Sequence, residues 1–240
     1  MREVETIAGD VTEIYRKSGS EAEKYLSKVR KLGGILGPGP AIIYCWFYSV
    51  PQKWTQVEPK IFELMECTNS FDLDVILSMP PRAIASVLKP MIFCNQISAQ
   101  LKRFCSAIKD EYNEWNNFAE ALRQENIFAI FWRIRKNRNV RVTFKNLAAM
   151  KAFVGLDDDL VILDTHVAKV MGIGRNELSN FRTHESPFKN LLETAKDVTA
   201  KLRKEYSDVA TIKWSLAIWF NATKISAIEL LTERVFHIGL

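Results

Sequence analysis

Two residues in this sequence, Lys145 and Asp164, have the types and the spacing that could do covalent chemistry. They lie nineteen residues apart, which suits a helix that begins at the lysine, a short turn over 156–159 and a second helix that begins at the aspartate. Both side chains can then face one cleft. A lysine amine is a nucleophile when it is deprotonated. A nearby carboxylate can help to remove its proton and can offset developing positive charge.

A basic run leads into the lysine and indicates what this chemistry would act on. Segment 133–145 contains basic residues and no acid: Arg133, Arg135, Lys136, Arg138, Arg141 and Lys145. Such clustering is typical of phosphate contacts with a nucleic acid, and the alternative is a solvated loop. Because the run leads into the Lys145–Asp164 pair, we favour the functional interpretation. We also expect Arg141 and its neighbours to lower the pKa of the lysine amine.

Each candidate residue also has a purely structural explanation. Asp164 fits the N-cap of a helix over 165–170 and could do both jobs, although its Asp-Thr-His-Val context favours catalysis. Lys145 could be a surface lysine at a helix start. Lys151 should point elsewhere, so it is the less suitable nucleophile. His166 suits packing or a phosphate contact better than a base. The histidines are scattered, so we expect no metal site and no cofactor.

The composition indicates a globular protein with a modest basic excess. The chain has 240 residues, of which 48% are hydrophobic and 25% charged, with a net charge of +5. We interpret the four cysteines as buried thiols of a reducing compartment. The N-terminus lacks the apolar core of a signal peptide, and the apolar run 41–50 is too short to span a bilayer. We therefore expect an intracellular protein with no membrane partner.

Helical spacing dominates the chain and predicts an all-α fold. In 1–32 the pattern predicts two amphipathic helices separated near 18–20, and the glycine- and proline-rich stretch 33–40 predicts a loop. Period-2 alternation is limited to 140–144. Further helices are predicted over 41–47, 54–65, 71–77, 82–88, 95–112, 118–122, 127–132, 164–170, 176–181, 187–204, 212–220 and 223–236.

Four stretches together resemble a known family. They are 41–62 (AIIYCWFYSVPQKWTQVEPKIF), 83–102 (AIASVLKPMIFCNQISAQLK), 145–155 (KNLAAMKAFVG) and 161–170 (VILDTHVAKV). In this order they are similar to the helix-hairpin-helix DNA glycosylase superfamily, which includes endonuclease III and the archaeal-type 8-oxoguanine DNA glycosylases. The ILDTHV match is the most specific of them.

The resemblance implies a two-lobed fold, with a barrel-like helical lobe over 41–140, a second lobe from 1–40 and 141–240, and the active site in the cleft between them. It implies a monomeric, cytoplasmic, nucleoid-associated base-excision-repair enzyme that acts on damaged double-stranded DNA. The lysine would attack C1′ of a nucleotide that carries an oxidised purine, with 8-oxoguanine as the expected base, and its Schiff base would permit strand cleavage. The implied DNA contacts are Arg138, Arg141, Thr143, Tyr48, Gln52 and His166, and the implied base-pocket residues are Trp214 and Phe144.

The hairpin before the lysine departs from the family. The family pattern L-P-G-[IV]-G-x-K places glycines where backbone amides approach a DNA phosphate. Here 139–145 reads NVRVTFK, without glycine. We expect side chains of Arg138, Arg141 and Thr143 to replace those backbone contacts. Two alternatives remain: a monofunctional alkylpurine glycosylase in which Asp164 works with water, and a DNA-binding protein without catalysis.

Overall fold

The chain folds entirely into helices and loops in the part that the structure describes, and no strand occurs there. A computed structural model describes residues 1–240 except 51, 137–138, 155, 228–229 and 231–240. The α-helices are α1 (Val4–Leu36), α2 (Pro38–Trp46), α3 (Trp54–Cys67), α4 (Leu73–Ser78), α5 (Pro81–Val87), α6 (Cys94–Tyr112), α7 (Trp115–Gln124), α8 (Ile127–Arg135), α9 (Phe144–Val154), α10 (Thr165–Val170), α11 (Leu178–Thr183), α12 (Glu185–Leu202) and α13 (Thr211–Thr223), and η1 (Phe47–Ser49) is a 3₁₀ turn. The all-α prediction is confirmed.

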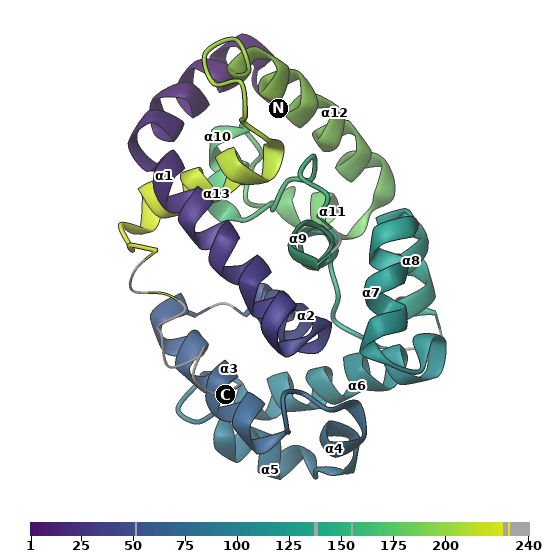
Figure 1. Cartoon of the computed structure of the whole chain (residues 1–240). Helices are drawn as coiled ribbons and strands as arrows, with labels where there is room; N and C mark the ends of the chain where they lie inside the picture. Colours follow the sequence, from purple (N-terminus) through teal and green to yellow (C-terminus); the bar gives the residue numbers. More distant parts are fainter. Residues whose placement is uncertain (51, 137–138, 155, 228–229, 231–240) are drawn as a thin grey trace.

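The first helix is continuous, so the prediction of two helices in 1–32 is wrong. Ser18 and Gly19 lie on its buried face. At Gly19 the ring of Tyr15 lies 3.0 Å from where a Cβ would be, so the absence of a side chain permits that contact. The helix packs along α13 and α12 (Figure 1). This tertiary packing outweighs the weak helix propensity of the Ser-Gly-Ser sequence.

The glycine- and proline-rich stretch 33–40 is mostly helical, contrary to the predicted loop. Helix α1 continues to Leu36, and Gly37 alone separates it from α2. Gly37 has a φ of 85°, which glycine adopts at little cost. Pro38 then starts α2, because the first turn of a helix needs no N–H donor at that position. A single residue therefore makes the turn.

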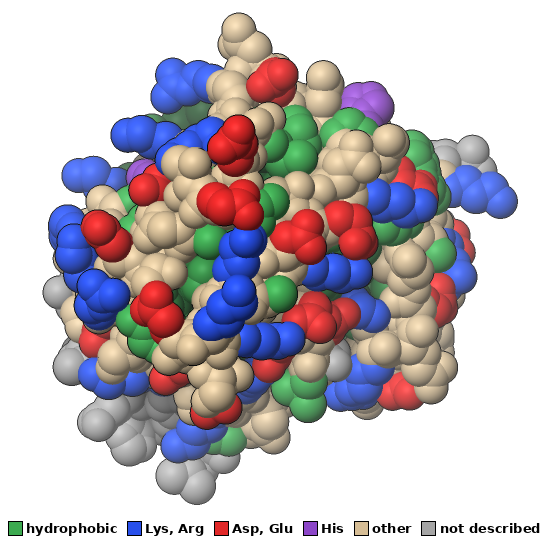
Figure 2. Space-filling view, turned by 90° about the horizontal axis from the view of Figure 1, so that it is seen from above, with side chains coloured by type: hydrophobic (Ala, Val, Ile, Leu, Met, Phe, Trp, Pro, Cys, Tyr) green, Lys and Arg blue, Asp and Glu red, His purple; other side chains and the backbone are tan. Residues whose placement is uncertain are grey.

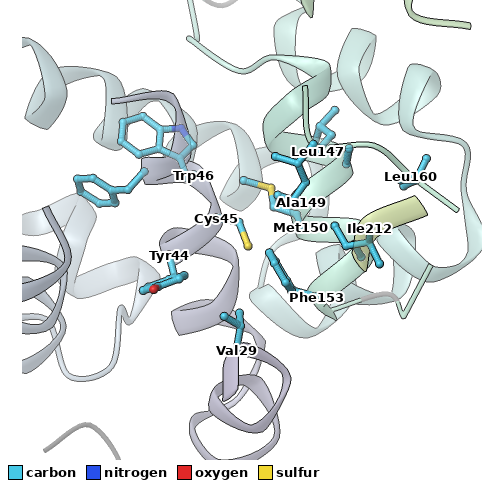
Figure 3. Close-up of a cluster of buried hydrophobic side chains, with 14 of the residues drawn as sticks. Val29, Tyr44, Cys45, Trp46, Leu147, Ala149, Met150, Phe153, Leu160 and Ile212 are labelled. Atoms are coloured by element: carbon cyan, nitrogen blue, oxygen red, sulfur yellow. The ribbon is translucent and has the colours of Figure 1, made fainter. Parts of the chain in front are cut away.

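Helix α2 lies at the centre of the molecule and is buried from Gly39 to Trp46. It packs between α1 and α9, while α3 to α6 lie beyond it at one end (Figure 1). Figure 3 shows Cys45 of α2 facing Met150 and Phe153 of α9. Helix α9 is buried on nearly all sides, with Lys145 and Lys151 as its partly exposed residues. The α2–α9 pair therefore joins the two ends of one continuous apolar core.

Most other helices are confirmed with shifted ends, and two predictions need correction. The helix predicted over 223–236 does not begin where expected, because α13 ends at Thr223 and Lys224 takes a left-handed conformation. Residues 228–229 and 231–236 of that prediction lie outside the described residues. The prediction of four buried thiols is wrong for two of them: Cys45 and Cys105 are buried, whereas Cys94 is half-buried and Cys67, which ends α3, is exposed. The predicted division into 41–140 and the remainder stays a prediction.

Gly39 offers a test of how tightly α2 is packed. A Cβ at this position would come 2.7 Å from the indole of Trp115, whose Nε1 donates to the carbonyl of Phe71 at 2.7 Å. We expect Gly39→Ala to lower the free energy of unfolding by about 1–3 kcal/mol, because the ring must shift. The control is Gly34→Ala, since Gly34 is also helical and has nothing within 4 Å; it should raise stability by about 0.5–1 kcal/mol. Urea unfolding measures both, and equal effects would contradict this packing.

Candidate active site

The first turn of α9 is held by side-chain hydrogen bonds at its N-terminus. Thr143 precedes the helix, and its hydroxyl accepts from the backbone N–H of Asn146 at 3.3 Å and donates to the Asn146 Oδ1 at 2.6 Å. The backbone N–H of Thr143 also donates to that oxygen at 3.2 Å. This reciprocal arrangement satisfies donors that a helix start leaves free. It fixes the backbone from which Lys145 projects.

The same turn is fastened to the C-terminal end of α2. The side-chain amide of Asn146 is fully buried and donates to the carbonyls of Trp46 at 2.9 Å and Cys45 at 3.3 Å. The last carbonyls of a helix lack partners within it. The Asn146 side chain therefore donates to the last carbonyls of α2 and positions the start of α9 through the same contact.

Lys145 is half-buried, and its amine donates to the backbone carbonyl of Tyr48 at 2.6 Å. The pKa of this amine is lowered from 10.5 to about 8, chiefly by burial and also by the nearby Arg182, while the carboxylate of Asp164 opposes the shift. A neutral amine can still donate one hydrogen to the carbonyl and direct its lone pair elsewhere. The environment therefore gives Lys145 a substantial neutral fraction slightly above neutral pH.

Asp164 caps α10 and is nearly buried, with 8% of its surface exposed. Its Oδ1 accepts from the backbone N–H groups of His166 at 2.8 Å and Val167 at 2.7 Å. Among the described residues no hydrogen bond reaches the second oxygen, Oδ2. The structural explanation of Asp164 as an N-cap is confirmed. The carboxylate also interacts electrostatically with Lys145 and Arg182, so the cap and the lysine share one site.

Arg182 is the cation beside Lys145, and the sequence did not indicate it. It projects from α11, and its Nε donates to the carbonyl of Leu163, next to Asp164, at 3.2 Å. Burial lowers the pKa of its guanidinium, and Asp164 opposes that shift. The expectation that Arg141 acts on the lysine is corrected, because Arg141 is exposed and contributes nothing to the lowered pKa of Lys145.

A cavity of about 1340 Å³ opens beside these residues. Its basic lining residues are Lys53, Arg135, Arg141, Lys145 and Arg182, whereas Asp164 is the one acidic residue among those described. By contrast, the face in Figure 2 carries Lys and Arg interspersed with Asp and Glu. A lining with this bias favours an anionic ligand.

Tyrosines form a buried hydrogen-bonded network behind the lysine. The hydroxyl of Tyr25 bonds with those of Tyr44 at 2.9 Å and Tyr48 at 2.8 Å. Tyr44 also donates to Glu58, a carboxylate that is 5% exposed. Because the carbonyl of Tyr48 accepts from Lys145, this network holds the acceptor that positions the amine. Satisfied buried networks of this kind make a core rigid.

The cavity brings together most of the predicted site residues. Its lining includes Lys145, Asp164, Arg141, Thr143, Tyr48, Gln52 and His166. Tyr48 is partly committed elsewhere, since its ring packs edge-on against Trp54 and Phe153. The side chain of Gln52 accepts from the backbone N–H of Ile92 at 3.1 Å. Arg138 lies outside the described residues.

The predicted base-pocket residues do not line the cavity. Trp214 is fully buried, and its Nε1 donates to the hydroxyl of Thr199 at 2.8 Å. Phe144 is fully buried too. The centroid of its ring lies 4.2 Å from that of the Phe131 ring and 5.1 Å from that of the Phe188 ring. Trp219 lines the cavity instead. The two tryptophans lie five positions apart, so they face different sides of α13.

Lys151 has a structural role. Its amine donates to the carbonyls of Leu122 and Glu125, both at 2.8 Å. These carbonyls end α7, where a cation is favourable. Lys151 is absent from the cavity lining, as expected for the less suitable nucleophile.

Comparisons with protein-family models, with curated proteins and with solved structures give no match to this chain. The assignment of function therefore depends on the site itself. No group of histidine, cysteine, aspartate and glutamate residues among those described could hold a metal ion. In the same part of the chain, every helix is too short or too polar to cross a bilayer.

The lowered pKa of Lys145 predicts a pH-dependent stability. The folded protein releases this proton near pH 8 and the unfolded chain near 10.5, so between these values the unfolded state binds more protons. The stability of the wild type should therefore rise over this range. Lys145→Met removes the buried charge, and we expect it to be more stable than wild type below pH 8, by on the order of 1–3 kcal/mol.

Urea unfolding at pH 7, 9 and 10.5 measures this difference, which should shrink as pH rises. The exposed Lys196, changed to methionine, is the matched control. A difference between Lys145→Met and wild type that stays constant across this range would contradict the lowered pKa.

Proposed function

We propose that this chain is a base-excision-repair DNA glycosylase with AP lyase activity that removes an oxidised purine, with 8-oxoguanine as the first substrate to test. The single observation that carries the proposal is the Lys145 amine, which has a pKa of about 8 and shares a basic cavity with Asp164. The proposal includes a monomer with a two-lobed helix-hairpin-helix fold. The proposed substrate is damaged double-stranded DNA.

The proposed reaction uses the neutral amine as a nucleophile. The nitrogen lone pair forms a bond to C1′ as the bond from C1′ to the base breaks, and the base leaves with that electron pair. The amine then loses a proton, its lone pair forms the second bond to C1′ as the C1′–O4′ bond breaks, O4′ takes up a proton as the sugar ring opens, and a Schiff base remains between the lysine nitrogen and C1′. Loss of a proton from C2′ and departure of the 3′ phosphate then cleave the strand. A pKa near 8 supports the first step, because much of the amine is neutral at mildly alkaline pH.

Asp164 has the position expected of a group that stabilises charge on the sugar. Its second oxygen has no hydrogen-bond partner among the described residues, while its first oxygen anchors the carboxylate to α10. A fixed carboxylate needs no rearrangement when positive charge develops at C1′. It can also accept the proton that the amine releases after attack.

The cavity also supports a nucleic-acid ligand. Its volume exceeds the roughly 300–1,000 Å³ that is usual for small-molecule pockets. Exposed apolar side chains lie at the same place: Phe93, which lines the cavity, is 58% exposed, and its neighbour Ile92 is 57% exposed. A ring beside a basic cavity could fill the space left by a base that rotates out of the duplex.

The covalent intermediate provides the decisive test. We expect borohydride to trap an adduct between the protein and a duplex that contains 8-oxoguanine or an abasic site. Lys145→Gln should abolish trapping, because the amide nitrogen is not nucleophilic. Lys151→Gln is the matched control and should retain it, since Lys151 only caps α7.

Two other outcomes distinguish the alternatives. Base release without an adduct, with 3-methyladenine as the substrate, would support a monofunctional alkylpurine glycosylase. Binding without base release would support a DNA-binding protein without catalysis. Denaturing gel electrophoresis of labelled duplexes separates these three results.

Asp164→Asn separates capping from catalysis. Asparagine is as good an N-cap as aspartate, so at a pH above the pKa of Lys145 the unfolding free energy should change little, whereas Asp164→Ala should lose about 1 kcal/mol. If the carboxylate acts in the reaction, base release by Asp164→Asn should be slower by about 10²–10⁴-fold. Removing the negative charge should also lower the pKa of Lys145 further and move the rising, acidic limb of the rate profile to lower pH. Single-turnover rates across pH measure both effects, and an unchanged rate would reduce Asp164 to a cap.

A further inference from the structure

A second hollow adjoins the active-site cavity at the end of α8. It has a volume of about 850 Å³ and is lined by Trp132, Arg133, Arg135, Lys136, Thr183 and His184. Arg135 and Thr183 also line the large cavity, so the two spaces are adjacent. The steps proposed above for Lys145 and Asp164 do not use this hollow.

Trp132 is 53% exposed within it. Its neighbour Phe131 on α8 is fully buried, and the two rings meet edge to face at 5.1 Å. The indole Nε1 donates to the carboxylate of Glu185 at 3.3 Å, which fixes the orientation of the ring. Burial of a tryptophan side chain is strongly favourable. An indole that is exposed and fixed in orientation therefore offers an aromatic surface that a ligand can cover.

Among the described residues around Trp132, two cations are paired with acidic side chains and two are not. Arg133 is paired with Glu125 at 2.9 Å and lies over the ring of Tyr112, so its charge is largely offset. Lys189 is paired with Glu185. Arg135 and Lys136 are exposed and have no acidic partner among the described residues. The guanidinium carbon of Arg135 lies 5.0 Å from the centroid of the Phe131 ring, which is a cation–π contact.

We propose that this hollow binds a nucleotide, with the base stacked on Trp132 and the phosphate held by Arg135 and Lys136. An aromatic face beside two free cations matches the two parts of a nucleotide, since every base has a π-face and every phosphate is an anion. The occupant is an unpaired nucleotide of the strand that leaves the active-site cavity, which rests on the proposed function. The same chemistry would accept a free nucleoside monophosphate.

The test measures the binding of a fluorescein-labelled hexathymidylate by anisotropy over a series of salt concentrations. Trp132→Ala should weaken binding about tenfold, as loss of one stacked base does, and Trp132→Phe should recover most of it. Lys136→Gln should reduce the slope of log affinity against log salt by about 0.7. Lys196→Gln is the matched control, because Lys196 is an exposed lysine of α12 far along the chain from α8. Equal affinities for Trp132→Ala and wild type would overturn the proposal.

Competition distinguishes the source of the nucleotide. Thymidine monophosphate that displaces the oligonucleotide at concentrations near its own dissociation constant would assign the hollow to free nucleotides. Failure to displace it would assign the hollow to a strand.

Trapping separates this site from the chemistry. At saturating abasic duplex, Trp132→Ala and Lys136→Gln should trap as wild type does. Loss of oligonucleotide binding on Trp132→Ala in a protein that never forms an adduct would refute the proposed reaction and retain the nucleotide site. An adduct that forms normally, together with oligonucleotide binding that Trp132→Ala leaves unchanged, would support the proposed reaction and refute the nucleotide site.

Discussion

The arrangement of the candidate site depends on how α9 is bonded to the carbonyls at the C-terminal end of α2 and in η1, which follows it. The carbonyls of Cys45 and Trp46 accept from the buried amide of Asn146, and that of Tyr48 accepts from the amine of Lys145. Two consecutive residues of α9 therefore bond to the end of α2 and to η1, although the carbonyls of Cys45 and Trp46 also accept from the N–H of Phe47 and from the hydroxyl of Ser49. In doing so they fix the amine at the edge of the cavity.

This arrangement also explains why the lysine is neither fully charged nor fully neutral. The C-terminal end of a helix favours a nearby cation, and so does the carboxylate of Asp164. Burial and the neighbouring Arg182 act in the opposite direction, and they prevail. The pKa of about 8 is thus a balance among groups from α9, α10 and α11. A change in any of them should alter the reactivity of the amine without touching the lysine itself.

The sequence predicted the local features of this site better than its long-range partners. The spacing of Lys145 and Asp164 depends on one helix and one turn, and both residues do line the same cavity. Arg182 could not be predicted, because it reaches the site from α11 through a contact with the carbonyl of Leu163. Choosing Trp214 over Trp219 failed because the rotation of α13 about its axis is set by its neighbours.

The prediction of a break in α1 failed for a related reason. The weak helix propensity of Ser18 and Gly19 is outweighed by the packing of α1 against α12 and α13.

The glycine-free segment 139–143 that precedes α9 has a physical consequence under the proposed function. The backbone N–H groups that precede α9 already have partners within the protein: Arg141 donates to Gln100 at 2.8 Å, Val142 to the carbonyl of Val140 at 3.1 Å, and Thr143 to Asn146 at 3.2 Å. A phosphate could recruit these amides only by breaking those bonds, and the segment contains no glycine to ease the approach. The cationic side chains of Arg135 and Arg141, by contrast, line the cavity. Under the proposed function, DNA would then be held chiefly by charged side chains and less by backbone N–H groups. Affinity that comes from side-chain cations depends steeply on salt, because each phosphate contact releases counterions.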